Sequence, residues 1–146
     1  MKLENCKLHI AHGIECLFAN VRRCYMHNCQ VKDTWPFMFS SNLKELVLKK
    51  AVCHQPSVTR LDMVKKLIQE GEKFRHDLRL LSIHCHTTED AVMALISHAH
   101  LFPHLEVLRI RYDQLRLSTS KIRIKLRLPH LKKLDLRGCL VKVDDP

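Results

Sequence analysis

The chain has 146 residues, of which 25 are Lys or Arg and 15 are Asp or Glu, so its formal net charge is +10 at pH 7. This length suits one domain, and we expect a single domain over residues 1–146. With 46% hydrophobic residues the chain can bury a core, which excludes intrinsic disorder. No apolar run approaches the roughly 20 residues that a membrane-spanning helix needs, and the first residues lack the pattern of a signal peptide. We therefore expect a soluble protein of the cytoplasm or nucleus that does not bind a membrane.

Leucine supplies 23 residues, and the leucines recur in a repeating pattern. Aligned segments carry apolar residues at relative positions 1, 4 and 6, a small polar residue or Cys at position 9, and an apolar residue at position 11. A partial first copy lies within residues 1–20. Five further copies begin at Val21, Leu43, Leu78, Leu105 and Leu131, so successive starts are 22, 35, 27 and 26 residues apart.

This pattern resembles the leucine-rich repeat, L-x-x-L-x-L-x-x-N/C-x-L, in the cysteine-containing form of F-box/leucine-rich-repeat proteins, and the resemblance covers nearly the whole chain. It implies an α/β fold: a right-handed, curved leucine-rich repeat solenoid of about five to six irregular repeats. A short parallel sheet would form its concave face, and helices or loops its convex face. No F-box is recognisable in the chain, and no capping unit is evident at either end.

Position 9 is where the resemblance implies a structural role for cysteine. There, Cys6, Cys29 and Cys139 would satisfy backbone groups where the chain turns away from each strand. Three other copies depart from the pattern at this position, with Ala51, His86 and Asp113. The chain has seven cysteines, an odd number without an export signal, so we expect most of them to be reduced and packed in the core.

The segments between the strands favour helices or loops. A short helix is expected around residues 12–19, and the stretch 34–41 is expected to be irregular. The clearest helix is expected over residues 59–70, because its apolar residues follow helical spacing and Gly71 marks its end.

Later in the chain, a further helix is expected to begin near Thr88, to bury Leu95, and to end before Pro103. Residues 122–128 alternate apolar and basic side chains, which predicts a half-buried strand that could pair with residues 116–118. This basic strand is either an interaction edge or simply a solvated face.

In the repeat register, positions 2, 3, 5, 7 and 8 of each complete copy lie on or beside the concave sheet surface. These positions hold eleven Lys or Arg and three acidic residues. The residues expected to contact a partner are Arg23, Tyr25, His27, Lys49, His84, Arg109, Arg111, Tyr112, Lys133 and Arg137. Tyrosines and the apolar residues Val47, Leu80 and Val107 would serve as anchors.

The sequence thus favours a protein–protein interaction module that binds an acidic partner through a basic concave face. The resemblance further implies the substrate-recognition part of an F-box-type ubiquitin ligase receptor, with ligase components as partners. A basic domain that binds nucleic acid is the alternative, because the charge alone supplies the electrostatic attraction. A solvated basic face without any partner also remains open.

Two groups of residues resemble metal ligands: Cys24, His27 and Cys29, and His84, Cys85 and His86. In the first, the repeat register directs Cys24 inward and His27 outward, so one ion could not bind all three. The second lacks a supporting C-x-x-C pair. We expect no metal, no cofactor and no catalytic residues, and hence a protein that is not an enzyme.

Overall fold

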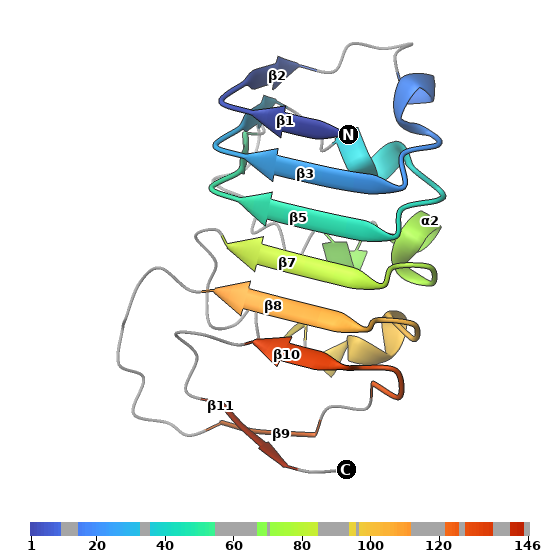
Figure 1. The fold of residues 1–146 in the computed structure, drawn as a ribbon, viewed down its shortest axis with the longest axis vertical. Coiled ribbons are helices and arrows are strands. Elements are labelled where there is room, and N and C mark those ends of the chain that lie inside the picture. Colours follow the sequence, from blue (N-terminus) through green and yellow to red (C-terminus); the bar gives the residue numbers. More distant parts are fainter. Residues whose placement is uncertain are drawn as a thin grey trace.

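A parallel sheet of six strands organises the chain in the computed structural model (Figure 1). The structure describes residues 1–9, 15–32, 36–54, 67–69, 71–84, 94–95, 97–111, 122–125, 128–135 and 141–144. In spatial order the six strands are β1 (Lys2–Glu4), β3 (Arg23–His27), β5 (Glu45–Lys49), β7 (Leu80–His84), β8 (Val107–Arg111) and β10 (Lys133–Asp135). Each strand pairs with the strand before it in this order, so the sheet grows along the chain in one direction.

Two smaller parallel sheets accompany the main one. The first contains β2 (Lys7–His9), β4 (Gln30–Lys32) and β6 (Val52–His54), each of which follows a strand of the main sheet after a short turn. The second pairs β9 (Ile122–Lys125) with β11 (Val141–Asp144). The fold is therefore mixed α/β with a mostly parallel sheet.

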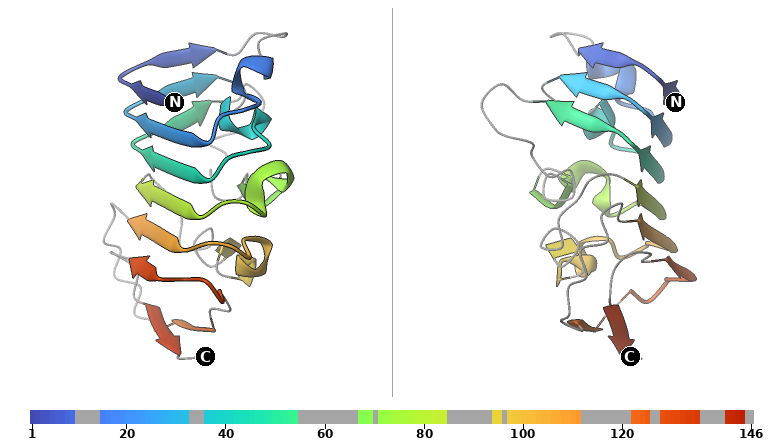
Figure 2. Two further views of the ribbon diagram at one scale, coloured as in Figure 1. Left: turned by 45° about the vertical axis from the view of Figure 1, so that its right-hand side comes forward. Right: turned by 90° about the vertical axis from the view of Figure 1, so that its left-hand side faces the viewer.

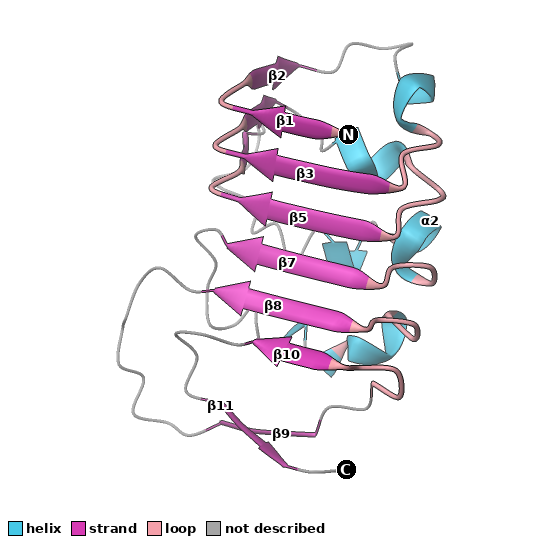
Figure 3. Cartoon of the chain, in the orientation of Figure 1, coloured by secondary structure: helices cyan, strands magenta, loops and turns pink. Residues whose placement is uncertain are grey.

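The helical segments are short and lie behind one face of the six-stranded sheet (Figures 2 and 3). Those with defined bounds are three 3₁₀ helices and one α-helical turn: η1 (Glu15–Phe18), η2 (Pro36–Phe39), α2 (Glu72–Arg75) and η3 (Ala99–Leu101). Residues 67–69, 94–95 and 97 are also α-helical. In the described part of the chain, no element covers the opposite face of the sheet, which we call the open face.

The strand register matches the alignment of the repeats. Position 4 forms one continuous row through the sheet, and position 6 forms the next. The first row contains Cys24, Leu46, Leu81, Leu108 and Leu134, and the second contains Leu3, Met26, Leu48, Ile83 and Ile110. All are buried except Leu3 and Leu134, which lie in the outermost strands and are half-buried. Because side chains alternate along a strand, positions 3, 5 and 7 necessarily face the other way.

Aromatic side chains from the helical segments complete the core behind these rows. Phe37 of η2, Phe74 of α2 and Phe102 after η3 are all buried. The Phe37 and Phe74 rings meet edge to face, with their centroids 6.0 Å apart. η2, α2 and the residue after η3 thus each add a large apolar side chain to the core behind the strands.

The turn that follows each of the first three strands has the same backbone conformation. Asn5, Asn28 and Lys50 have φ values of 52°, 51° and 51°, in the left-handed region. Asn tolerates this conformation better than other non-glycine residues, and the Asn28 amide donates a 2.8 Å hydrogen bond to Asn5 Oδ1. The turn at Lys50 keeps this geometry although Ala51 occupies position 9, so the departure from the pattern there does not alter the turn.

The cysteines at position 9 contact backbone carbonyls beside this turn, as expected. Cys6 Sγ lies 3.4 Å from the Glu4 carbonyl oxygen, and Cys29 Sγ lies 3.3 Å from that of His27. The two sulfur atoms are 3.6 Å apart. Burial, followed by the hydrogen bond with Cys29, raises the pKa of the Cys6 thiol. Cys139 is outside the described residues.

Several local expectations need correction. The described end of the expected helix at 12–19 is the 3₁₀ helix η1, and Cys16 within it is exposed rather than in the core. The stretch 34–41 contains η2, whose buried side chains make it part of the core. Proline is compatible with the first turn of a helix, where its missing N–H costs nothing.

Residues 67–69, the described end of the expected helix, are helical, and Gly71 follows them as a turn residue, as predicted; a separate helical turn, α2, begins directly after it. The Gly71 φ of −78° is ordinary, so a left-handed cap does not explain the glycine. A Cβ atom there would instead clash with the carbonyl oxygen of Leu67 and crowd the Phe74 ring. Most of the helix expected over 59–70 falls outside the described residues.

The structure agrees in part with the helix expected between Thr88 and Pro103 and with the strand expected over 122–128. Leu95 is buried and η3 ends before Pro103, as predicted, although Thr88 is not described. A strand is confirmed at 122–125, and it pairs with β11. The suggested partner segment, 116–118, lies outside the described residues.

Candidate partner-binding face

Three rows of side chains, at positions 3, 5 and 7 of the aligned segments, face the open side of the sheet, and a fourth row, at position 2, lies along its strand-start edge. The entry row, just before the strands, holds Arg22, Lys44, Arg79, Glu106 and Lys132. The inner row holds Arg23, Glu45, Leu80, Val107 and Lys133; the centre row holds Lys2, Tyr25, Val47, Ser82, Arg109 and Asp135; and the exit row holds Glu4, His27, Lys49, His84 and Arg111. Backbone hydrogen bonds join neighbours in the entry row, from Lys44 N to Arg22 O and onward to Lys132 N.

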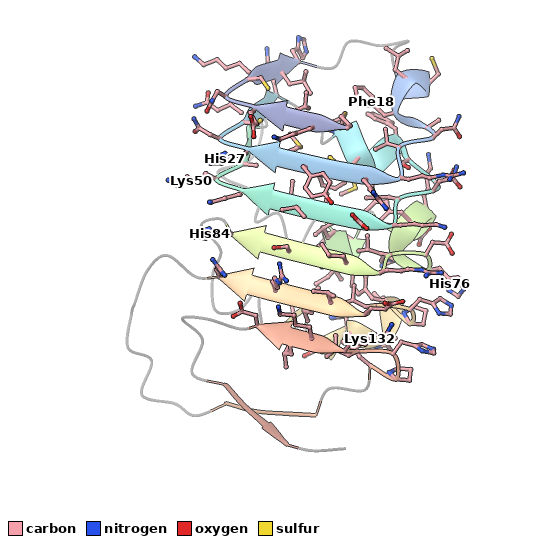
Figure 4. All side chains as sticks on the ribbon, viewed as in Figure 1. Phe18, His27, Lys50, His76, His84 and Lys132 are labelled. Carbon is pink, nitrogen blue, oxygen red and sulfur yellow. The ribbon has the colours of Figure 1, made fainter. Side chains whose placement is uncertain are left out.

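Eight of the ten residues predicted to contact a partner lie together on this face. They are Arg23, Tyr25, His27, Lys49, His84, Arg109, Arg111 and Lys133. The other two, Tyr112 and Arg137, are outside the described residues. Figure 4 shows His27, Lys50 and His84 near the ends of their strands, and Lys132 at the opposite edge.

The carboxylates at the ends of the sheet are already engaged by cations of the same face. Glu4 lies 3.1 Å from Lys2 Nζ, and Asp135 lies 3.7 Å from Arg111. Their negative charges are therefore largely offset within the protein.

The carboxylate of Glu45 lies between two side chains of β3. Its Oε2 atom accepts a 2.7 Å hydrogen bond from the Tyr25 hydroxyl and lies 3.5 Å from Arg23 Nε. Donating to a carboxylate stabilises the neutral phenol, so the pKa of Tyr25 is raised. This hydrogen bond holds the Tyr25 side chain in place while the residue stays 37% exposed.

Glu106 is the fourth carboxylate and the only acid of the entry row. Lys132 Nζ donates a 2.9 Å hydrogen bond to it, and Arg79 lies 3.8 Å away on the other side. The hydrogen bond from Lys132 is the main reason that the pKa of Glu106 is lowered. At neutral pH this carboxylate is ionised and shared by two cations.

The cations outnumber these acids. Within the described part of the face, six have no carboxylate within 4.0 Å: Arg22, Lys44, Lys49, Lys50, Arg109 and Lys133. Lys49 and Lys50 lie at the end of β5, between His27 and His84 of the neighbouring strands. Among the described residues, these six positive charges therefore have no carboxylate partner within the face.

A strip of apolar side chains crosses the middle of the face. Tyr25 pairs with Val47 in the centre row, and Leu80 pairs with Val107 in the inner row. Val47, Leu80 and Val107 are half-buried, so part of each remains available for contact. These residues lie where the sequence register placed the apolar anchors.

Sequence reasoning missed a row of histidines at the strand-start edge. The rings of His76 and His104 have centroids 5.0 Å apart, and those of His104 and His130 are 5.6 Å apart. All three side chains are exposed. Each histidine lies one or two residues before position 1 of its repeat, so extending the alignment backwards would have revealed the row.

No cluster of three suitable metal ligands occurs in the described part of the chain. Cys24 is buried in the sheet core, and this burial raises the pKa of its thiol to about 12. His27 lies on the opposite side of β3, while Cys85 and His86 are outside the described residues. None of the helices in the described segments has the length and apolarity needed to span a membrane.

The structure thus defines a mixed α/β protein whose parallel sheet presents a predominantly basic face. Neither protein-family models, nor curated proteins, nor solved structures provide a match to this chain.

Proposed function

We propose that this chain is a curved leucine-rich repeat solenoid that binds an acidic partner protein through its open face. Support for the repeat architecture comes from the agreement between sequence alignment and strand register. Successive repeats of different lengths place equivalent residues side by side, and the turns after the first three strands share one conformation. Each such unit leaves an apolar edge that the next unit covers.

The observation that carries the binding proposal is the imbalance of charge pairing on the open face. All four described carboxylates of the face are held by its own cations, while six cations have no carboxylate partner in the part of the chain that the structure describes. A partner that supplies carboxylates would complete these pairs. Complementary charge of this kind chiefly accelerates encounter and sets specificity.

Protein is favoured over nucleic acid as the partner because of the apolar strip. Tyr25, Val47, Leu80 and Val107 offer an anchor for apolar side chains, whereas phosphate backbones need only the cations. Stacking of unpaired bases would need several exposed aromatic rings, and the described open face has only Tyr25. We infer that the chain acts by binding and not by catalysis.

The cysteine-containing repeat type suggests one setting for such binding, the substrate-recognition part of an F-box-type ubiquitin ligase receptor. In that setting the open face would bind the substrate, and another segment or protein would contact the ligase. Ligase components among proteins recovered with the chain would support this setting, and their consistent absence would contradict it.

The test compares two charge-reversed variants that have the same net charge. The face variant is Lys49→Glu with Arg109→Glu, because neither cation has a carboxylate partner in the described structure. The control is Lys32→Glu with Lys73→Glu, on exposed positions of β4 and α2 away from the open face. Each protein is used to capture partners from cell extract, with and without nuclease, and the recovered partner is then purified and titrated directly.

The proposal expects a nuclease-resistant protein partner that binds the wild type and the control but not the face variant. Equal binding by both variants would place the interaction elsewhere on the molecule. Recovery that disappears with nuclease would make nucleic acid the partner.

A further inference from the structure

We propose that the segment bound by the open face is an amphipathic α-helix that has an apolar stripe flanked by acidic residues on both sides. The helix would lie across the strands, along the direction in which they stack. This inference rests on the proposed function and adds the form of the partner. It comes from the order in which charged and apolar rows succeed one another on the face.

Cations occupy both outer rows, and the apolar strip lies between them. The entry row carries four cations and one acid, which is itself shared by two of those cations. The exit row carries Lys49, His27, His84 and Arg111, which is paired with Asp135, and its one acid is Glu4, which is paired with Lys2. Lys50 lies directly beyond this row. A matching surface must therefore present acid, apolar groups and acid in that order.

The distance between the two outer rows fits a helix. Entry and exit residues are five positions apart along each strand, which corresponds to about 16 Å. An α-helix with its side chains is about 10–12 Å wide, so a helix lying over the strip would place its flanking carboxylates above the two rows. Long Lys and Arg side chains bridge the remaining gap.

An extended peptide fits this order less well. If such a peptide lay across the strands, its side chains would alternate between two opposite directions. The side chains that point toward the sheet would form a single line, so they could not contact three rows at once. Running along each strand instead, a peptide would cross the rows but would meet only one strand's residues. An amphipathic helix presents an apolar stripe at least about 100° wide, which covers the strip, and the residues on either side of this stripe lie above the two borders.

The apolar strip also runs in the direction that a helix would take. It crosses four adjacent strands, from Tyr25 on β3 through Val47 and Leu80 to Val107 on β8. Strands lie about 4.8 Å apart, so the six strands span about 24 Å, the length of about 16 helical residues. Beyond Val107 the next inner-row residue is Lys133, a cation without a carboxylate partner in the described structure, which suits an acidic helix end.

The test uses synthetic peptides of 16 residues, labelled with fluorescein and blocked at both ends. One carries a leucine stripe with Glu on both borders; the second has the same composition in scrambled order; the third has the stripe with Lys in place of Glu. A 16-base-pair DNA duplex is the fourth probe. Affinities are measured by fluorescence anisotropy for the wild type, the Lys49→Glu, Arg109→Glu face variant, and a Val47→Thr, Leu80→Thr strip variant, whose folding is checked by circular dichroism.

The striped acidic peptide should bind about tenfold more tightly than the scrambled peptide, because only it joins apolar burial to charge pairing. The strip variant should remove this preference, and the face variant should weaken both acidic peptides. The Lys-bordered peptide should not bind measurably.

Equal affinity for striped and scrambled acidic peptides would overturn the helix inference, and so would failure of the striped peptide to bind. Neither result touches the proposed function, which fails only if the partner recovered from extract binds the face variant as well as the control. Tighter binding of the duplex than of the striped peptide, undiminished in the strip variant, would overturn the inference in favour of nucleic acid.

Discussion

Replacing Leu81 by Ala tests which side of the strands is the core. Leu81 is fully buried at position 4 of β7, between Leu46 and Leu108 of the adjacent strands. The change removes three carbon atoms, a transfer loss of about 2 kcal/mol. Backbone pairing on both sides holds the neighbours in place, so a cavity remains and raises the total to about 3–4 kcal/mol. Urea unfolding followed by circular dichroism measures this loss.

The neighbouring residue on the same strand provides a matched control. Leu80 faces the open side and is half-buried, so Leu80→Ala removes the same atoms but should cost only about 1 kcal/mol, without an internal cavity. A larger loss for Leu80→Ala than for Leu81→Ala would refute the assignment of the two faces, since a shift of one residue exchanges them throughout a strand.

Three other substitutions test separate features. Gly71→Ala should destabilise the fold by about 1–3 kcal/mol in urea unfolding, despite the better helix propensity of alanine, because its Cβ would meet a backbone carbonyl; a stabilised variant would contradict this. Ser40→Ala should cost about 1–3 kcal/mol, because the buried hydroxyl donates a 2.6 Å hydrogen bond to a carbonyl that would lose its partner, and an unchanged midpoint would show that another group replaces it. Spectrophotometric titration, with the second tyrosine replaced by Phe, should place the pKa of Tyr25 above the usual value of about 10, and Glu45→Gln should lower it. Because the pKa of Tyr25 is higher in the folded protein, the stabilisation from this hydrogen bond is complete below the pKa of the unfolded state and is lost as pH rises through the pKa of the folded state. The same titration midpoint for Tyr25 with and without Glu45→Gln would count against the hydrogen bond.

The strand register was predictable because burial imposes it. Alternating positions such as Leu46 and Leu48 must both face the core, and the same spacing recurs in each copy. Once those positions are fixed, the outward residues follow by alternation. This is why Arg109, Tyr25 and the apolar strip were placed correctly on one face.

Features that depend on tertiary packing were less predictable. Gly71 follows the helical residues 67–69 as its sequence predicts, but its close approach to the Leu67 carbonyl oxygen and the Phe74 ring could not be predicted. Likewise, Pro36 predicts an irregular backbone, whereas the segment forms η2 and Phe37 packs in the core against Phe74. Local signals do not reveal which distant side chain will fill a gap.

The pairing of acids on the face could not be read from composition either. A count of charges gives the excess of cations but not which cations remain without partners. Glu106, for example, is shared between Arg79 and Lys132, which come from repeats on either side of it. The strand register together with the reach of the side chains shows that Arg79 and Lys132 are paired with Glu106, whereas Lys49 and Arg109 have no carboxylate partner among the described residues.

In the entry row, backbone hydrogen bonds join residues that are far apart in sequence. Neighbouring residues of that row are 22, 35, 27 and 26 positions apart in sequence, yet each joint is closed by an N–H···O hydrogen bond of 2.8 Å. Segments behind the sheet can therefore gain or lose residues while the open face keeps its spacing. An insertion within a strand would turn core residues outward. Changes of length should accordingly accumulate on the back of the molecule, leaving the face free to diverge by substitution alone.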